Sequence, residues 1–238
     1  VQIRNYSLEI ENDFLSARQY ESNFLDNWRL LGFDEAEVRF ITPYTTSINL
    51  ARTHLFELIQ LIDRLNTSQL RPVRPAVDAL APLLETYIST FQDTRNAVQT
   101  RSESGGVEQT LQRHWESLRA YVEDLNNRQL YELLMLIKVN EQAYFNTRQQ
   151  AFLDNIRILS LQFERLAPNF FDAPIASEFL PDLETVINQL DDYQATLNEL
   201  VVLDQDILAN SELGRDVAEN INIYTAQLNS AAQTSLTL

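Results

Sequence analysis

Two stretches of the chain carry one polar motif: a basic residue, a glutamate three positions later and an aromatic residue three positions after that. The motif occurs in LSARQYESNFL as Arg18, Glu21 and Phe24, and about 120 residues later in LIKVNEQAYFN as Lys138, Glu141 and Tyr144. Residues three apart share one face of a helix, so each motif sets a cation beside a carboxylate. The chemistry available to such a pair is an ion pair or the binding of a small charged ligand.

Both glutamates continue an apolar helix face. The apolar residues on these faces are Ile10, Phe14, Ala17, Phe24 and Trp28 around Glu21, and Leu134 and Ile137 before Glu141. An unpaired buried charge costs several kcal/mol, so each carboxylate near a core needs a partner. Two interpretations stay open: Glu21 and Glu141 form a structural polar layer with Arg18 and Lys138, or at least one of these cations binds a ligand.

Further cations are expected at the height of this layer. With the last helix running back past the first, Arg215 falls within about a turn and a half of Arg18, next to Gly214, and RSESGG brings Arg101 to the same level. We expect Arg18, Lys138, Arg215 and Arg101 to line a small-anion site where glycines thin the packing. A second candidate layer consists of Arg113 and Arg128, and the alternative for each arginine is a solvated helix surface.

Other kinds of chemistry find no support in the sequence. The chain has no phosphate-binding loop, nucleophile elbow or HExxH motif, and His54 and His114 stand far apart without metal-ligand spacing. We therefore expect no enzymatic activity, no cofactor and no metal. Aromatic residues at helical spacing, such as Tyr87, Trp115 and Tyr193, are more typical of a core than of a binding pocket.

The composition excludes several partners. The 34 acidic and 18 basic residues among 238 give a formal charge of -16, which repels nucleic-acid phosphates and anionic membrane surfaces. The absence of cysteine excludes disulfides and thiolate chemistry. No run of 18 apolar residues occurs, so no segment of the sequence spans a membrane. The start at Val1, without a methionine, suggests a fragment of a longer protein.

Hydrophobic periodicity and the scarcity of glycine and proline predict an all-α fold. The predicted helices cover about residues 3–31, 34–65, 75–101 with a continuation over 107–124, 130–147, 149–167 and 181–238. Pro43 makes the first turns of the second helix irregular, and SESGG either ends or interrupts the third. The segment from Ala167 to Pro181 is expected to be a loop.

The second half of the chain repeats the first. LLETYISTF matches QLDDYQATL, with Tyr87 over Tyr193, and Gly106 corresponds to Gly214. The chain therefore reads as two copies of a short, short, long helix unit, six helices of which two are long, stacked as two four-helix bundles. We assign about 1–32, 103–147 and 210–238 to a membrane-proximal bundle, and about 33–102 and 148–209 to a membrane-distal one, within a single bimodular domain.

The stretches ARQYESNFL, LLMLIKVNEQAYF, YISTFQ with SGG, and YQATLNEL with LGR resemble the helical bimodular sensor domain of bacterial chemoreceptors and sensor histidine kinases. This resemblance covers essentially the whole chain. It implies a periplasmic or extracytoplasmic domain between flanking transmembrane helices of an inner-membrane receptor. It also implies a homodimer in the full receptor and a small organic acid bound between helices. Dicarboxylate-binding members carry two closely spaced arginines on the first helix, whereas here Gln19 and Tyr20 follow Arg18, which argues against a dicarboxylate.

The resemblance favours a methyl-accepting chemotaxis protein that signals by helix displacement. The output module stays open between a chemoreceptor, a histidine kinase and a cyclase. One alternative is a sensor that docks a periplasmic binding protein at NFFDAPIASEFL, residues 169–180. Another is a purely structural helical rod.

Overall fold

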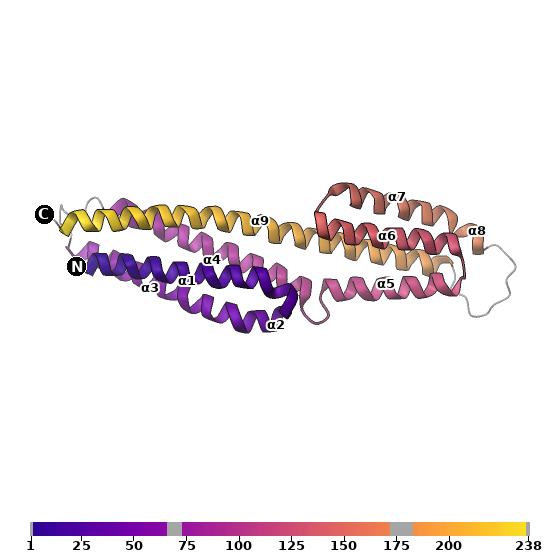
Figure 1. Ribbon diagram of the computed structural model, residues 1–238, viewed down its shortest axis with the longest axis horizontal. Helices are drawn as coiled ribbons and strands as arrows, with labels where there is room; N and C mark the ends of the chain where they lie inside the picture. Colours follow the sequence, from indigo (N-terminus) through magenta and orange to yellow (C-terminus); the bar gives the residue numbers. More distant parts are fainter. Residues whose placement is uncertain (1, 66–72, 172–182, 237–238) are drawn as a thin grey trace. The chain divides into compact units, whose positions relative to one another are not determined.

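A computed structural model describes residues 2–65, 73–171 and 183–236, and it contains helices and no strand among them. The elements are α1 Gln2–Leu31, α2 Phe33–Ala36, the π-helical turn η1 Glu37–Ile41, α3 Thr42–Leu65, α4 Arg74–Ser102, α5 Val107–Asp124, α6 Arg128–Thr147, α7 Gln150–Leu166, α8 Pro168–Phe171 and α9 Leu183–Leu236. The all-α prediction is confirmed, and the predicted helix ranges agree with these bounds to within a few residues (Figure 1).

The chain forms two compact units. Unit 1 comprises Val1–Gly106 and Val202–Leu238, and unit 2 comprises Val107–Val201. This grouping differs from the predicted one, which separated residues 1–32 from 33–102 and joined them to 103–147. The cause is the turn at Gly32, which folds α3 back along α1, so that both helices belong to the same unit. Figure 1 shows α1, α3, α4 and the C-terminal part of α9 running alongside one another in unit 1.

The turn between α1 and α2 depends on Gly32, whose φ of 84° lies in the left-handed region that favours glycine. Its amide donates to the carbonyl of Trp28 at 2.9 Å and closes the last turn of α1. Farther along, Ala17 of α1 and Ala51 of α3 are both fully buried. Small side chains allow two helices to approach closely, so α1 and α3 form the tightest helix pair of unit 1.

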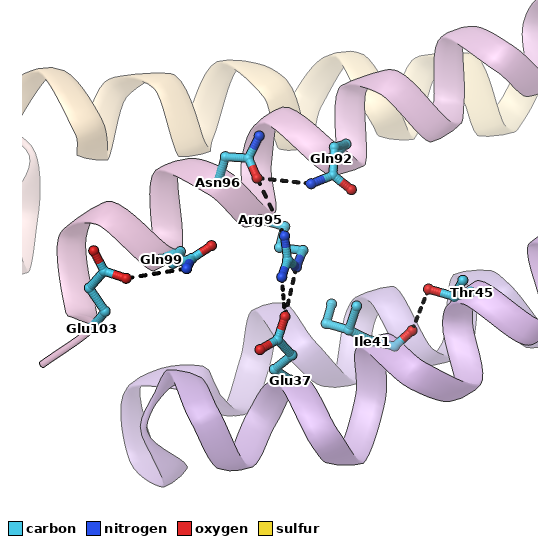
Figure 2. A network of polar contacts seen from close by, with 8 residues as sticks. All are labelled: Glu37, Ile41, Thr45, Gln92, Arg95, Asn96, Gln99 and Glu103. Atoms are coloured by element: carbon cyan, nitrogen blue, oxygen red, sulfur yellow. Dashed lines mark hydrogen bonds and ion pairs between the residues drawn. The ribbon is translucent and has the colours of Figure 1, made fainter.

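The helix that follows Gly32 begins irregularly, as Pro43 predicts. Residues Glu37–Ile41 form a π-helical turn just before that proline, whose nitrogen cannot donate a backbone hydrogen bond. In Figure 2 the Glu37 carboxylate of this turn faces the guanidinium of Arg95 on α4, with which it forms a half-buried ion pair. The Arg95 guanidinium also lies 5.7 Å from the ring centroid of Phe33. The π-helical turn is therefore anchored to α4 by one arginine.

The third predicted helix is interrupted at SESGG, between α4 and α5. Gly105 has a φ of 83°, and a Cβ on Gly106 would lie 2.8 Å from the Thr100 carbonyl oxygen and 2.9 Å from that of Glu103. Both positions therefore require glycine. One of the two predicted long helices is thus divided into α4, with 29 residues, and α5, with 18, whereas α9 continues for 54.

Unit 2 consists of α5, α6, α7, α8 and the first part of α9. The Asn127 side chain caps α6 by accepting hydrogen bonds from the amides of Gln129 and Leu130 at 3.0 and 3.1 Å. At the other end of α6, Arg148 adopts the left-handed conformation with φ 60° and turns the chain into α7. Figure 1 shows α6 and α7 side by side as a helical hairpin.

None of the helices in the described parts of the chain combines the length and the apolar character needed to cross a bilayer.

Candidate functional site in the core of unit 1

The centre of the candidate site is the carboxyl group of Glu21, which α1 places on its core-facing side between Ala17 and Phe24. The Tyr87 hydroxyl of α4 donates a short hydrogen bond to Glu21 Oε2. Tyr87 is only 1% exposed and Glu21 is half-buried, so this bond lies at the border of the hydrophobic core. Sequence reasoning placed Glu21 near a core but did not identify Tyr87 as its partner.

Burial is the main influence on the protonation of Glu21. Removal from water raises its pKa above the ordinary value of 4.5, and the hydrogen bond from Tyr87 and the positive charge of Arg18 offset part of this rise. The phenol of Tyr87 responds in the same direction: burial, and then the nearby charge of Glu21, raise its pKa. Glu21 therefore keeps its proton to a higher pH than a solvated glutamate.

A second tyrosine, Tyr44 of α3, lies beside Tyr87, with the two ring centroids 6.4 Å apart. Tyr44 is 5% exposed, and its hydroxyl is buried without a hydrogen-bond partner among the described residues. Its pKa is raised by burial and then by the charge of Glu21. The Tyr44 ring packs against Phe91 with centroids 4.4 Å apart. Since buried hydroxyl groups nearly always have a partner, the free hydrogen-bonding capacity of Tyr44 is an unusual feature.

The fourth helix of unit 1 contributes a glycine. A Cβ built on Gly214 of α9 would lie 3.6 Å from Glu21 Oε1 and 3.7 Å from Thr90 Cγ2. The backbone of α9 therefore passes directly beside the carboxyl group, and the hydrogen of Gly214 occupies a place where a methyl group would fit. Four helices, α1, α3, α4 and α9, thus meet around one ionisable side chain.

The structure brings the predicted cations of unit 1 together only in part. Arg18 lies half-buried beside Glu21, whereas Arg215 is exposed next to Gly214. Arg101 is 4% exposed and is held elsewhere, in an ion pair with Asp204 and 5.6 Å from the Trp28 ring centroid. Trp28 is ten residues beyond Arg18, about 15 Å farther along α1. The sequence predicted Arg101 in the same layer as Arg18, and the structure places it outside that layer.

The Arg101 cluster is a separate polar feature that sequence reasoning missed. Asp204, 1% exposed, also accepts a hydrogen bond from Arg29 at 3.2 Å, and the Arg29 guanidinium lies 5.0 Å from the Trp28 ring centroid. Two guanidinium groups thus share one carboxylate and one indole. The sequence offered one signal for Asp204, an acidic residue that interrupts the apolar face of α9 between Leu200 and Ile207.

Unit 2 contains a polar group of the same composition. The Tyr193 hydroxyl of α9 donates to Glu141 Oε2, and Lys138 Nζ lies 2.7 Å from Glu141 Oε1. The ammonium group of Lys138 is also 5.1 Å from the ring centroid of Trp115. Burial, and then the charge of Glu141, raise the pKa of Tyr193. Each predicted glutamate is thus bonded to a tyrosine of its own unit, at the two positions that the internal sequence match aligns.

The second predicted cation layer does not converge in unit 2. The side chain of Arg128 is 91% exposed and pairs with Glu132 one turn later, at 2.7 Å. Arg113 is exposed and donates to Thr110 Oγ1 at 2.8 Å. Both arginines therefore have local partners on their own helices, as the alternative of a solvated helix surface describes.

Histidine adds one polar contact in unit 1. His54 Nδ1 lies 2.9 Å from Asp13 Oδ2, and its Nε2 lies 3.8 Å from Glu9 Oε2. In the described ranges, no three His, Asp or Glu side chains are grouped so as to hold a metal ion. The protein-docking segment suggested at residues 169–180 falls mostly outside the described residues.

Comparison of the chain with protein-family profiles, with curated proteins and with solved structures gives no match.

Proposed function

We propose that the chain is the ligand-binding sensor domain of a transmembrane bacterial receptor, and that unit 1 binds a small organic acid around Glu21. The observation that carries the proposal is the unpartnered, buried hydroxyl of Tyr44 beside a buried carboxyl group. Burying an ionisable group and leaving a hydroxyl unpaired both cost stability. Perturbed groups of this kind are concentrated at functional sites.

The chemistry around Glu21 suits a monocarboxylate. Arg18 supplies a positive charge, and Tyr44 has a hydroxyl group available to donate. Because the pKa of Glu21 is raised, its protonated form is available to share a hydrogen bond with a second carboxylate. A ligand with two carboxylates would need a second cation in the same layer, and the structure places Arg101 elsewhere.

The wider setting of the proposal comes from the sequence. The resemblance to helical bimodular sensor domains favours two four-helix bundles made from a duplicated unit, a homodimer, and an extracytoplasmic location. The antiparallel pairing of α1 and α9 supports attachment at one end: the Ser7 hydroxyl donates to Asn229 Oδ1, so the first turns of α1 lie beside the last turns of α9. The matching Glu–Tyr pairs in the two units support the duplication.

Signalling requires a ligand that prefers one packing of the helices over another. A ligand held by Arg18, Tyr44 and Glu21 would contact α1 and α3 and lie against Gly214 of α9. Its binding would draw α9 toward α1, and a displacement of α9 is the output that the family resemblance suggests. The difference in the ligand's affinity between the packing with α9 closer to α1 and the packing with α9 farther away sets the size of the response.

A thermal-shift screen against acetate, propionate, pyruvate, lactate, succinate and malate tests the proposal. A ligand at 100 times its Kd adds about 2.7 kcal/mol to the free energy of unfolding, which gives a measurable rise in Tm. We expect a monocarboxylate to raise Tm, and Arg18→Ala and Tyr44→Phe to abolish the rise. Arg128→Ala is the matched control, because it removes an exposed arginine from unit 2. No rise in Tm with any of these acids, or a rise in Tm that persists in Tyr44→Phe, would refute the site.

A further inference from the structure

A concave site lies on the surface of unit 1, between α3 and α4. It has a volume of about 710 Å³, within the range of small-molecule sites, about 300–1,000 Å³. Its floor is formed by the buried side chains of Leu55 and Leu84, and Phe56, which is 59% exposed, stands at its side. The groove is separate from the Glu21 site and shares no residue with it.

The composition of α4 explains why the groove is open. Ala81 and Pro82 line it from α4, and both have short side chains. Pro82 stands inside the helix, where its ring clashes with the preceding turn and it lacks an amide to donate. A small side chain and a proline thus stand on α4 where longer side chains would fill the groove.

One end of the groove is charged. Arg52 Nε lies 2.8 Å from Glu85 Oε1, and the terminal Arg52 nitrogen lies 3.2 Å from Glu85 Oε2, a two-bond pair between α3 and α4. Both side chains are about half exposed, so solvent reaches the pair and its members can change partners.

The antiparallel register of α3 and α4 orders the groove from polar to apolar. Arg52 stands level with Glu85, and one turn farther along, about 6 Å, Phe56 stands level with Ala81. The site thus offers a positive and a negative charge side by side, followed at a distance of one turn by an apolar surface.

We propose that this groove binds a zwitterionic α-amino acid with a large apolar side chain. Its carboxylate pairs with Arg52 and its ammonium group with Glu85, so both charges of the site keep a partner when the pair opens. A simple carboxylic acid would take Arg52 and leave Glu85 beside a second anion. A simple amine would leave Arg52 unpaired. The apolar side chain then lies between Phe56 and Ala81 on the leucine floor.

The test measures binding to the 238-residue chain by calorimetry, with L-phenylalanine, 3-phenylpropionate and 2-phenylethylamine as probes. We expect L-phenylalanine to bind and each analogue, which lacks one charge, to bind at least about tenfold more weakly. Arg52→Gln, Glu85→Gln and Ala81→Leu should each weaken L-phenylalanine binding by about tenfold or more, the last by filling the groove. All three positions are exposed or half-exposed, so the fold tolerates these changes.

Matched control variants show whether a loss of binding arises in this groove. Arg39→Gln removes an arginine from the exposed pair with Glu35, and Ala120→Leu enlarges an exposed alanine of α5; both should leave binding unchanged. Arg18→Ala should also leave it unchanged, because the groove does not depend on the Glu21 site.

Three results would overturn the proposal: no binding of L-phenylalanine at millimolar concentrations, equal binding of 3-phenylpropionate, or undiminished binding by Ala81→Leu. A fourth result against the proposal would be a dimer, detected by sedimentation, that Ala81→Leu dissociates, because a second copy of the chain would then occupy the groove.

Discussion

Replacement of Gly214 by alanine should stabilise the protein. Gly214 lies inside α9 and is buried, and the new methyl carbon would meet Glu21 Oε1 at 3.6 Å and Thr90 Cγ2 at 3.7 Å, which are ordinary contact distances. Alanine is favoured over glycine in a helix interior by about 1 kcal/mol. Burial of one methyl group adds about 0.8 kcal/mol, less the cost of crowding a carboxyl group. We expect a net gain of about 1–1.5 kcal/mol.

The gain is measured by urea unfolding and by Tm. For a protein of this size, 1 kcal/mol corresponds to roughly 2–4 °C, so Gly214→Ala should raise Tm by about 3–5 °C. Ala209→Gly is the matched control: Ala209 is exposed on the same helix, and its replacement should cost about 1 kcal/mol through helix propensity alone.

A loss of stability in Gly214→Ala would refute the reasoning, because it would mean that α9 lies closer to Glu21 than these contacts indicate. The same substitution also bears on the proposed function. The methyl group takes up space beside Glu21, so a ligand bound there should bind more weakly to a protein that is itself more stable. If Gly214→Ala raises the free energy of unfolding and weakens ligand binding, then glycine at this position favours binding at the expense of stability.

Three further substitutions probe the other features. Gly106→Ala should destabilise the protein by about 1–3 kcal/mol, because its Cβ would press on the carbonyl oxygens of residues 100 and 103, as urea unfolding will show. Glu21→Gln should raise Tm more at pH 7 than at pH 4. Glu21 keeps its proton in the native state above pH 4.5, where the unfolded chain releases it. The free energy of unfolding therefore falls as pH rises through the raised pKa, and glutamine, which does not titrate, removes that fall. An equal change in Tm at both pH values would contradict this. Asp204→Ala should cost about 3–5 kcal/mol by removing the buried carboxylate that pairs with Arg101, whereas replacing both by apolar residues should cost much less, which a double-mutant cycle measures.

The helices could be predicted from the sequence because their signals are local. Apolar spacing determined their extents, Gly32 marked the end of α1, and Pro43 marked the irregular turn at Glu37–Ile41. The position of Glu21 and Glu141 on core-facing surfaces followed from the same spacing. Each of these features depends on residues within a few positions of one another.

The partners of these residues could not be predicted in the same way, because they depend on how the helices pack. The sequence showed Tyr87 and Tyr193 as matching positions of the two halves, but no local pattern indicated that each would donate a hydrogen bond to a glutamate. Arg101 was placed by the level at which the third helix was expected to pass Arg18, whereas its pairing with Asp204 depends on how α4 and α9 pack. The grouping of the helices into units failed for a related reason: the length of a helix does not say which neighbour it packs against.

The two seams on either side of α3 differ in the charged side chains that they contain. On one side, fully buried alanines set α3 against α1. On the other side, α3 and the turn before it meet α4 through buried apolar contacts such as Tyr44 on Phe91, and also through three charge pairs, in which Arg95 binds Glu37, Arg52 binds Glu85 and Arg74 binds Asp63. Dissolved salt screens such pairs over a distance of about 8 Å at physiological ionic strength, whereas it leaves apolar packing intact. At high ionic strength α4 should therefore move more freely against α3 where these pairs join them, on the microsecond-to-millisecond scale of helix movements.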